Sequence, residues 1–431
     1  MAPTRKKSEG LLARVNFPLY TLQMLTNRHV LVAGGGGSSK TGVANGFEIF
    51  ELIFDGKRFI AKEVMRHETG PKVVMNCASF YDKKNTFLVA GQESHCQLYR
   101  IAITVDKEDV NTESSKSNGA IEQNSLRKRK GSKVSDVSNN TPDGNRKSTQ
   151  KYLKFKFNAQ DSIQTDFSET EPIQRVVRIS RCGKLMATGG TDGHVRLWTF
   201  PALKSLHDIN AHTKELDDID FSPNSKTLVS VSKDGKALIW SVLNGKKLLD
   251  LTWNVPDGVK YLFKRCRYGP IEADKSKCRV FTISNCMTTP AASNAAAPGI
   301  LHQWCGETGT VKKCVTLSES LSALAVRDDG TFLAIGTMFT GTVAVYIAFS
   351  LQCVLNVKGA HSMFVTGLEL LPSQGCSIAS DSEAAVLSIS VDNKICIHNL
   401  PYRRTLPPWI VIVLIMITLF CTFFFCSYIG L

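Results

Sequence analysis

The sequence predicts an all-β protein, a seven-bladed WD-repeat-like β-propeller followed by a single-pass C-terminal transmembrane helix. Short strand-like runs separated by turn residues recur along the 431-residue chain, and no long amphipathic helical pattern interrupts them before Trp409. Residues 183–198 and 225–240 align almost residue for residue, with an Asp-Gly pair and a tryptophan that each recur 42 positions later. That spacing is the period of a propeller blade.

The N-terminal segment, residues 1–14, is expected to be flexible. Its first ten residues are polar and basic, and the apolar stretch of a signal peptide does not follow them. The propeller is expected to occupy residues 15–404, with a first blade that runs from Leu31 to Leu52. We expect residues 17–20, Phe-Pro-Leu-Tyr, to pair with the last blade, because closing the ring hides its sheet edges.

A glycine-rich loop, residues 34–46, interrupts the first blade. Ordering its four consecutive glycines costs roughly 0.5–1 kcal/mol per residue relative to alanine, so we expect a compensating gain from an ion or a closely approaching partner. Lys40-Thr41 almost completes a phosphate-binding P-loop, but Ser39 stands where that motif needs glycine, and residues 47–52 then alternate like a strand. The pattern favours a binding loop over a nucleotide cradle. The alternative is a mobile hairpin tip.

The other blades are marked to different degrees. Units at residues 86–99, 331–346 and 360–398, with a poorly marked one near residues 256–315, bring the count to seven. In a WD repeat, a histidine, a turn aspartate, a strand serine and a tryptophan form a buried hydrogen-bonded chain. In the unit that ends at Trp240 these residues are His212, Asp234, Ser230 and Trp240. We interpret them as structural and not as a catalytic dyad.

Residues 105–150 are rich in Ser, Asn, Lys, Asp and Thr and poor in large apolar residues, which predicts a disordered insertion between the second and third blades. Its basic run, Arg127–Lys130, has two interpretations, a nuclear import signal or a solvated linker. Residues 164–167 resume an ordered pattern, but their spacing assigns them no chemistry.

The segment 409–431 is long enough to cross a bilayer core of about 30 Å. Arg403, Arg404 and Trp409 mark one membrane interface, and the two arginines place the large domain in the cytosol. We therefore expect a tail-anchored protein. A cytosolic domain also accounts for the thirteen cysteines, which include no C-x-x-C pair and are expected to be reduced.

The formal net charge of +14 permits a nucleic-acid partner. However, no segment combines a basic stripe with interleaved aromatic residues, and the densest basic cluster lies in the insertion. A diffuse positive surface suits the anionic cytosolic leaflet of a membrane equally well.

Several motifs resemble the prolactin regulatory element-binding protein family, the metazoan ER-anchored guanine-nucleotide exchange factors that load the COPII coat small GTPase. The resemblance runs from Phe17 through the anchor and is weakest in the insertion. Its most specific marks are Gly34–Gly37, Lys40–Val43 with Asn45-Gly46, Ala90–Gln92, His95–Leu98, Gln164–Phe167 and Tyr346–Cys353. The resemblance implies GDP release and GTP loading at the ER membrane, without covalent chemistry, as the start of COPII vesicle formation and ER-to-Golgi transport.

The resemblance also implies a site. In the family the first-blade loop binds a potassium ion and enters the nucleotide-site region of the GTPase, where an asparagine in a Gly-apolar-x-Asn pattern is essential. Here that pattern falls on Gly42, Val43 (the apolar wedge), Ala44 and Asn45. We expect the ion to be held by carbonyls of Gly34, Gly35, Gly36 and Gly37 and by the Asn45 side-chain oxygen, with the Asn45 amide still presented to a partner and Lys40 pointing outward.

Two other functions are compatible with the sequence. A DNA-binding transcriptional regulator with a nuclear pool is suggested by the family name, although the transmembrane segment counts against it. A propeller scaffold without exchange activity is the third possibility.

Overall fold

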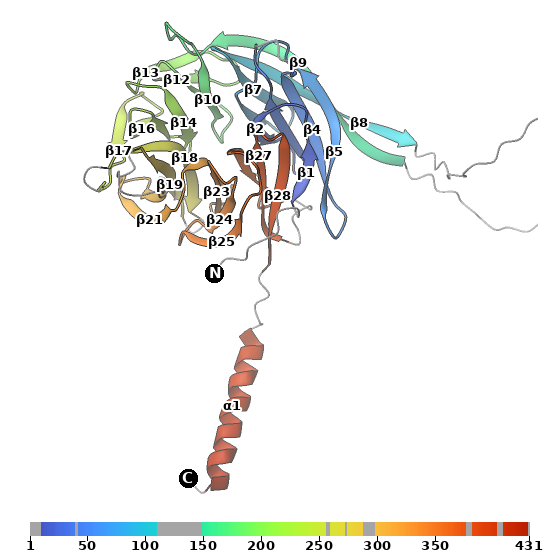
Figure 1. The fold of residues 1–431 in the computed structure, drawn as a ribbon, viewed down its shortest axis with the longest axis vertical. Coiled ribbons are helices and arrows are strands. Elements are labelled where there is room, and N and C mark those ends of the chain that lie inside the picture. The colour runs from blue at the N-terminus through green and yellow to red at the C-terminus, as the bar shows by residue number, and fades with distance from the viewer. Residues whose placement is uncertain are drawn as a thin grey trace, which may run out of the picture.

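In the computed structural model, the described residues are 10–38, 42–109, 149–255, 259–271, 274–287, 298–375, 382–402 and 408–429. Their strands form seven four-stranded antiparallel sheets that follow one another around a ring (Figure 1). This confirms the predicted seven-bladed propeller, including the poorly marked fifth blade. The basic run 127–130 lies outside the described residues.

Each of the first six blades uses four consecutive strands, ordered from the ring centre outward. The first three blades comprise β2 (Leu19–Met24), β3 (His29–Gly34), β4 (Gly46–Phe54) and β5 (Phe59–Glu68); β6 (Asn76–Tyr81), β7 (Thr86–Gln92), β8 (His95–Asp109) and β9 (Thr149–Gln164); and β10 (Gln174–Ile179), β11 (Leu185–Gly190), β12 (His194–Thr199) and β13 (Ser205–Asn210).

The next three blades comprise β14 (Leu216–Phe221), β15 (Thr227–Ser232), β16 (Ala237–Ser241) and β17 (Lys247–Asp250); β18 (Tyr261–Ile271), β19 (Asp274–Cys286), β20 (Gly299–Cys305) and β21 (Val311–Leu317); and β22 (Leu321–Val326), β23 (Phe332–Thr337), β24 (Val343–Ile347) and β25 (Gln352–Val357). The seventh blade takes β26 (Val365–Leu370), β27 (Ser382–Ser390) and β28 (Lys394–Pro401) from the end of the propeller.

The fourth strand of the seventh blade comes from the N-terminal part of the chain. Strand β1 (Leu11–Arg14) pairs with β28, and Leu11 lies opposite Cys396. Two expectations were wrong here. The segment 1–14 is not flexible throughout, and the closing strand precedes residues 17–20. Leu19 instead begins the innermost strand of the first blade, where it pairs with Gly34 and is fully buried.

The two faces of the ring carry different connections. We call "upper" the face that bears the turns between second and third strands and the connections between blades, and "lower" the face that bears the other turns. Because neighbouring strands are antiparallel, these two sets of turns lie at opposite ends of the blades. The glycine-rich loop joins β3 to β4 and so lies on the upper face. Strand β28 is the third strand of its blade and ends at the lower face, from which the chain continues to helix α1 (Pro408–Ile429; Figure 1).

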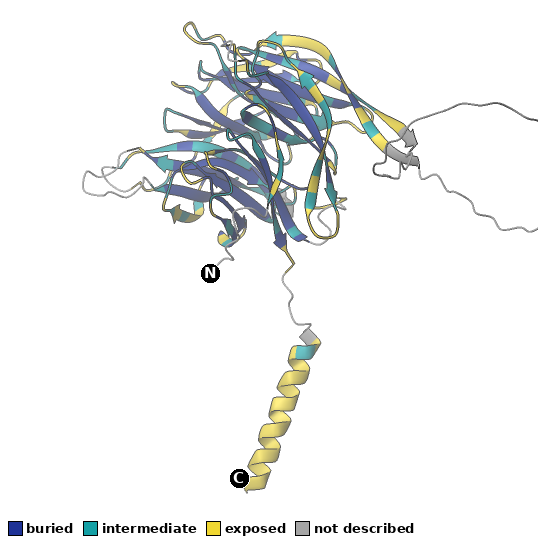
Figure 2. Cartoon of the chain, turned by 45° about the vertical axis from the view of Figure 1, so that its right-hand side comes forward, coloured by how far each residue is buried: buried dark blue, intermediate teal, exposed yellow. Residues whose placement is uncertain are grey.

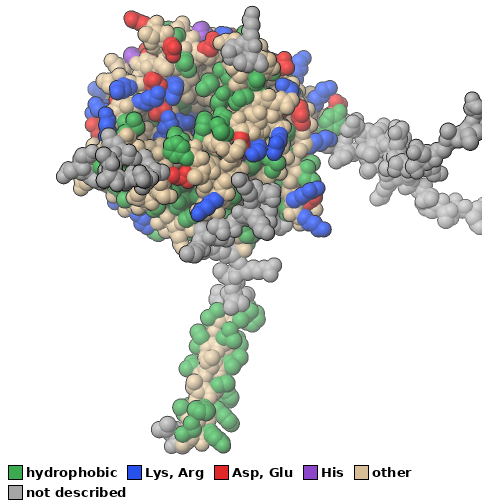
Figure 3. Space-filling view, in the orientation of Figure 1, with side chains coloured by type: hydrophobic (Ala, Val, Ile, Leu, Met, Phe, Trp, Pro, Cys, Tyr) green, Lys and Arg blue, Asp and Glu red, His purple; other side chains and the backbone are tan. Residues whose placement is uncertain are grey.

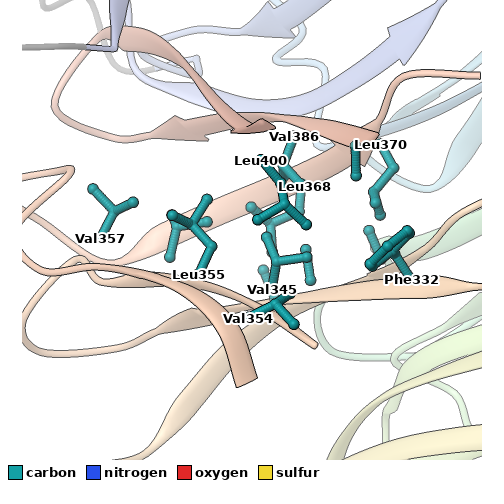
Figure 4. Close-up of a cluster of buried hydrophobic side chains, with 14 of the residues drawn as sticks. Phe332, Val345, Val354, Leu355, Val357, Leu368, Leu370, Val386 and Leu400 are labelled. Atoms are coloured by element: carbon teal, nitrogen blue, oxygen red, sulfur yellow. The ribbon is translucent and has the colours of Figure 1, made fainter. Parts of the chain in front are cut away.

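The core consists of apolar clusters between adjacent blades, so most strands are buried on both faces (Figure 2). Figure 4 shows the cluster between the sixth and seventh blades, where Phe332, Val345 and Leu355 pack against Leu368, Val386 and Leu400. Burial of apolar surface contributes about 25 cal/mol per Å², and this packing holds each blade to its neighbours.

The second blade carries a long hairpin. Strands β8 and β9 remain paired as far as Asp109 and Thr149. The expected disordered insertion at 105–150 therefore began too early and ended too late, because residues 105–109 and 149–150 belong to strands. Residues 110–148 lie outside the described part of the chain.

Helix α1 stands apart from the propeller (Figure 1) and presents apolar side chains around its surface (Figure 3). Its 22 residues correspond to a length of about 33 Å. By length and composition, the segment Trp409–Ile429 could cross a membrane, as expected, and none of it is buried against the rest of the chain.

Candidate functional site

The glycine-rich loop leaves β3 at Gly34 and returns to β4 at Gly46, and these two glycines lie opposite each other in the sheet. The strand after the loop confirms that the helix required by a P-loop is absent here. Ser39, Lys40 and Thr41 lie outside the described residues, so the outward direction of Lys40 stays a prediction.

Asn45 fixes the shape of the loop. Its side chain is buried, with 5% of the residue exposed. The main-chain N–H of Gly37 donates to Asn45 Oδ1 at 2.9 Å, while Asn45 Nδ2 donates to the carbonyl oxygens of Gly37 at 3.1 Å and Gly70 at 3.0 Å. Both N–H groups of the amide are thus used inside the chain. The expectation that this amide faces a partner is wrong for this conformation, because it serves to hold the loop.

Close main-chain approaches explain the first two glycines. A Cβ added to Gly34 would lie 1.9 Å from the carbonyl oxygen of Pro18, and one added to Gly35 would lie 2.0 Å from Asn45 Oδ1. The Gly35 N–H also donates to the Pro18 carbonyl at 3.1 Å. Any larger residue would therefore displace either the first strand of the blade or the Asn45 amide.

Gly37 and Gly42 are needed for a different reason. They have φ angles of +82° and +76°, in the left-handed region that favours glycine, although a Cβ on either would meet open space. Gly36 is half-buried. The loop therefore uses glycine for close approach near its base and for backbone direction farther out.

Val43 is half-buried and packs against the apolar cluster that contains Phe17 and Leu19. Only part of its side chain is therefore available as a wedge. Gly42 beside it is exposed. Gly42 is therefore the more exposed of these two neighbouring residues.

The connection between the first and second blades forms hydrogen bonds with the base of the loop. The Asn45 carbonyl accepts a hydrogen bond from the Thr69 N–H at 3.0 Å, and the Thr69 hydroxyl donates to the carbonyl of Lys72 at 2.9 Å. With the bond from Asn45 to Gly70, these contacts join the loop to residues 69–72. The loop is therefore braced on two sides, by Pro18 and by this connection.

The donor set of the loop fits a monovalent cation. Its described oxygens are main-chain carbonyls and the neutral amide oxygen of Asn45, and K⁺ is bound by such oxygens in selectivity filters. The Gly37 carbonyl and Asn45 Oδ1 each accept a hydrogen bond, and each oxygen has a second lone pair. No group of three or more His, Cys, Asp or Glu side chains suited to a metal occurs among the described residues. The loop thus suits K⁺ better than a transition metal.

The predicted WD-repeat residues form a structural chain in the fourth blade. His212 Nδ1 lies 3.0 Å from Asp234 Oδ2, His212 Nε2 lies 2.8 Å from Ser230 Oγ, and Trp240 Nε1 donates to the same hydroxyl at 2.8 Å. Burial lowers the pKa of His212, and the Asp234 carboxylate opposes that shift. Every polar group of the chain has a partner, which agrees with a structural role.

The third blade contains an equivalent set of buried hydrogen bonds, centred on Asp166, that was not predicted from the sequence. This carboxylate is fully buried and accepts hydrogen bonds from the Thr191 hydroxyl at 3.0 Å and the Asp192 N–H at 3.1 Å. Asp166 therefore joins the connection before β10 to the turn after β11, as His212 does one blade later. The only sequence signal was an acidic residue within the ordered but unassigned segment 164–167.

The comparisons with known proteins agree with this fold. Residues 163–199 and 203–241 match the family model "WD domain, G-beta repeat". The chain is 35% identical over 416 residues to the "Guanine nucleotide-exchange factor SEC12" of Mus musculus and, at the same identity and length, to that of Rattus norvegicus, covering 94% of this chain and 93% of each relative. It is also 27% identical over 215 residues to "SEC12-like protein 1" of Arabidopsis thaliana, which covers 49% of each chain. The chain therefore belongs to the SEC12 family of guanine nucleotide-exchange factors.

Proposed function

We propose that this chain is a guanine-nucleotide exchange factor for the COPII coat small GTPase at the ER membrane. It promotes GDP release and GTP loading there and so starts COPII vesicle formation for ER-to-Golgi transport. The observation that carries the proposal is the glycine-rich loop held in one shape by Asn45 on the upper face. Similarity to the mouse and rat exchange factors over nearly the whole chain supports the activity, and the motif resemblance supports the choice of GTPase.

The loop acts by contact and not by covalent chemistry. A segment that is already ordered loses less conformational entropy when it docks, so more of its binding free energy is available to displace the nucleotide-binding segments of the GTPase. Asn45, Gly37 and Gly70 supply this order through three hydrogen bonds. The exposed end of the loop near Gly42, with the accessible part of Val43, makes the contact.

Nucleotide release then follows from linkage. If the loop binds the nucleotide-free GTPase more tightly than the GDP-bound form, GDP binding must weaken by the same factor. A thousandfold acceleration of release requires the barrier to fall by about 4 kcal/mol. One ordered loop and part of the upper face suffice for a change of this size.

A potassium ion would stiffen the loop further. We propose that carbonyls among Gly34–Gly37 and the Asn45 side-chain oxygen hold it, since these are the neutral oxygens of the loop. When bound, the ion supplies positive charge that orients these carbonyls inward. The hydrogen bonds between Asn45 and Gly37 already hold the amide oxygen beside the last of these four glycines.

Helix α1 would anchor the protein in the ER membrane with the propeller in the cytosol. Because the chain leaves the lower face toward α1 and the loop lies on the upper face, the loop is carried on the side of the propeller opposite the anchor attachment. A GTPase reaching the loop from the cytosol then does not have to pass between propeller and bilayer.

The proposal is tested by measuring the release of fluorescent GDP from the purified COPII coat GTPase with the full chain in detergent micelles or vesicles. We expect the wild-type chain to accelerate GDP release strongly and the Asn45→Ala variant to accelerate it at least tenfold less. Asn27→Ala, which changes an asparagine on the lower face, is the control and should promote GDP release at the wild-type rate. Replacing K⁺ by Li⁺ should slow exchange by the wild type. Equal rates for wild type and Asn45→Ala would instead support a scaffold without exchange activity, and equal rates in every monovalent cation would refute the ion site.

A further inference from the structure

The lower face of the propeller is much more basic than the upper face. Exposed basic side chains in its described turns are Arg28, Lys57, Arg58, Lys83, Lys84, Arg181, Lys184, Lys204, Lys226 and Lys246. The exposed acidic side chains in those turns are Asp55, Asp82, Glu307 and Asp328. In the described turns of the upper face, the exposed charged residues are nearly balanced, with Lys214, Lys236, Lys260 and Lys358 against Glu93, Glu169 and Glu171. Among the turns that the structure describes, the exposed positive charge is thus concentrated on the side where the chain continues to α1.

A groove between the first and second blades lies at the lower ends of their strands. Its volume is about 1170 Å³, and its basic lining residues are Arg28, Lys62, Lys84 and Arg100, with Glu51 as the acidic one. Arg28 donates to Glu51 at 2.8 Å, and Arg100 donates to the Asn85 side chain. Lys62 and Lys84 are exposed and form no ion pair with any residue that the structure describes. The groove therefore offers two free ammonium groups to an anion.

Exposed apolar side chains accompany this charge. Leu243, Phe349 and Tyr402 lie on the lower side with 88%, 65% and 59% of their surfaces exposed. The Lys313 ammonium lies 4.7 Å from the centre of the Phe349 ring, and the Arg279 guanidinium lies 5.4 Å from it. Aromatic rings beside cations are typical of side chains at a membrane interface.

The covalent connection limits how far this face can move from a membrane that holds α1. From Tyr402 to Pro408 the chain covers six residue steps, which span at most about 20 Å when fully extended. The attraction of a lysine or arginine to an anionic leaflet decays within a Debye length of about 8–10 Å. The link therefore keeps this part of the lower face within about 20 Å of the start of α1 and allows it to come within the range of the attraction.

We propose that the lower face, centred on the groove between the first and second blades, binds the anionic phospholipid headgroups of the membrane that holds α1. The inference rests on the membrane anchor of the proposed function but not on nucleotide exchange. The free ammonium groups of Lys62 and Lys84 contact headgroup phosphates, and the other basic turns follow the leaflet around them. This second attachment fixes the orientation of the propeller, with the upper face directed away from the bilayer.

The test uses the full chain reconstituted into vesicles, with residues 403–407 replaced by a protease recognition sequence. Cleavage releases the propeller from α1, and sedimentation then measures how much remains on the vesicles. We expect retention on vesicles of phosphatidylcholine with phosphatidylserine, release from vesicles of phosphatidylcholine alone, and loss of retention as salt is raised. An addition of inorganic phosphate at matched ionic strength should not release the propeller, which separates a headgroup surface from a phosphate site.

Paired variants locate the surface. Removing two lysines near an anionic leaflet should lower partitioning roughly tenfold or more, so Lys62→Gln with Lys84→Gln should lose retention. The matched pair Lys214→Gln with Lys358→Gln removes the same charge from the upper face and should stay within twofold of the wild type. Near-ultraviolet circular dichroism checks that both pairs are folded.

Three results would overturn the proposal: equal retention on neutral vesicles, equal loss with both pairs, or a short DNA duplex that binds the released propeller more tightly than the anionic vesicles do. In detergent, the variant with Lys62→Gln and Lys84→Gln should still promote GDP release from the coat GTPase at the wild-type rate. Failure of the lipid surface is therefore distinguishable from failure of the exchange function.

Discussion

Asn45 and Gly37 bind each other reciprocally: the Gly37 N–H donates to Asn45 Oδ1 at 2.9 Å, and Asn45 Nδ2 donates to the Gly37 carbonyl at 3.1 Å. The pair closes the loop across eight residues, so the essential asparagine of the family pattern is internal to the loop here. The hydrogen bonds of its side chain set the shape of the loop.

The Asn45–Gly37 pair predicts the order of the loop. Asn45→Ala leaves the Gly37 N–H and the carbonyls of Gly37 and Gly70 without these partners, so the loop should open locally while the sheets remain intact. We expect the Gly37 amide to exchange hydrogen at least tenfold faster by mass spectrometry or NMR, with little change in the main thermal transition. Unchanged protection at Gly37 would show that the glycines hold the loop without Asn45.

The glycines of the loop should differ in their tolerance of alanine. Gly35→Ala places a Cβ 2.0 Å from Asn45 Oδ1. The Cβ of Gly42→Ala has no neighbour within 4 Å, so its cost is that of a left-handed φ, about 1–2 kcal/mol. We therefore expect Gly35→Ala to abolish most GDP release activity and Gly42→Ala to reduce it less. The comparison is made at equal protein concentration after both variants pass size-exclusion chromatography as folded species. The reverse order of activities would contradict the close-approach argument.

The buried chain of the fourth blade predicts a stability effect. Ser230 Oγ is the shared partner of His212 Nε2 and the Trp240 indole N–H. Ser230→Ala leaves both buried groups without that partner, which should lower the free energy of unfolding by about 2–4 kcal/mol. Thermal melting of the full chain measures the loss. Ser241→Ala, outside the chain of hydrogen bonds described above, is the control and should melt near the wild type.

Glu369 predicts a pH dependence. It lies on β26 and lines the central cavity of about 290 Å³. Burial raises its pKa to about 7, although Arg178 and Arg267 oppose the shift and Asp328 adds to it. The native chain thus holds this proton more tightly than the unfolded chain, whose glutamate titrates near pH 4.3. The contribution of Glu369 to stability is therefore complete below about pH 4.3 and declines as the pH rises to about 7.

Glu369→Gln removes this titration. We expect the variant to gain thermal stability over the wild type at pH 8 and to differ much less from it at pH 5, with other groups titrating equally in both proteins. A gain of the same size at both pH values would mean that the carboxyl group is ionised throughout this range in the folded protein.

The repeat and the hydrogen-bonded chain of the fourth blade could be predicted from the sequence, because both depend on nearby residues at fixed spacing. His212, Ser230 and Trp240 show this. Ring closure was misplaced by a few residues. Both Leu11–Arg14 and residues 17–20 are short apolar segments, and which of them pairs with β28 depends on contacts almost four hundred residues away. Local pattern does not contain that information.

The glycines located the candidate loop in the sequence, but they did not predict the hydrogen bonds that hold it. Composition shows that Gly34–Gly37 need a compensating gain, while one of the two hydrogen-bond partners of the Asn45 side chain lies in a turn 25 residues later, at Gly70. Likewise, the concentration of basic residues on one face arises because turns distant in sequence meet at the same ends of the blades. A net charge of +14 says nothing about that arrangement.

The pairing of β1 with β28 also sets an order of events during synthesis. The ring cannot close until β28 has left the ribosome, and by then Pro408, only seven residues after Pro401, is next to emerge. Final folding of the propeller and emergence of the apolar helix therefore fall within the same short interval. Any partner or membrane that captures this helix before that interval ends meets a propeller whose seventh blade is still open.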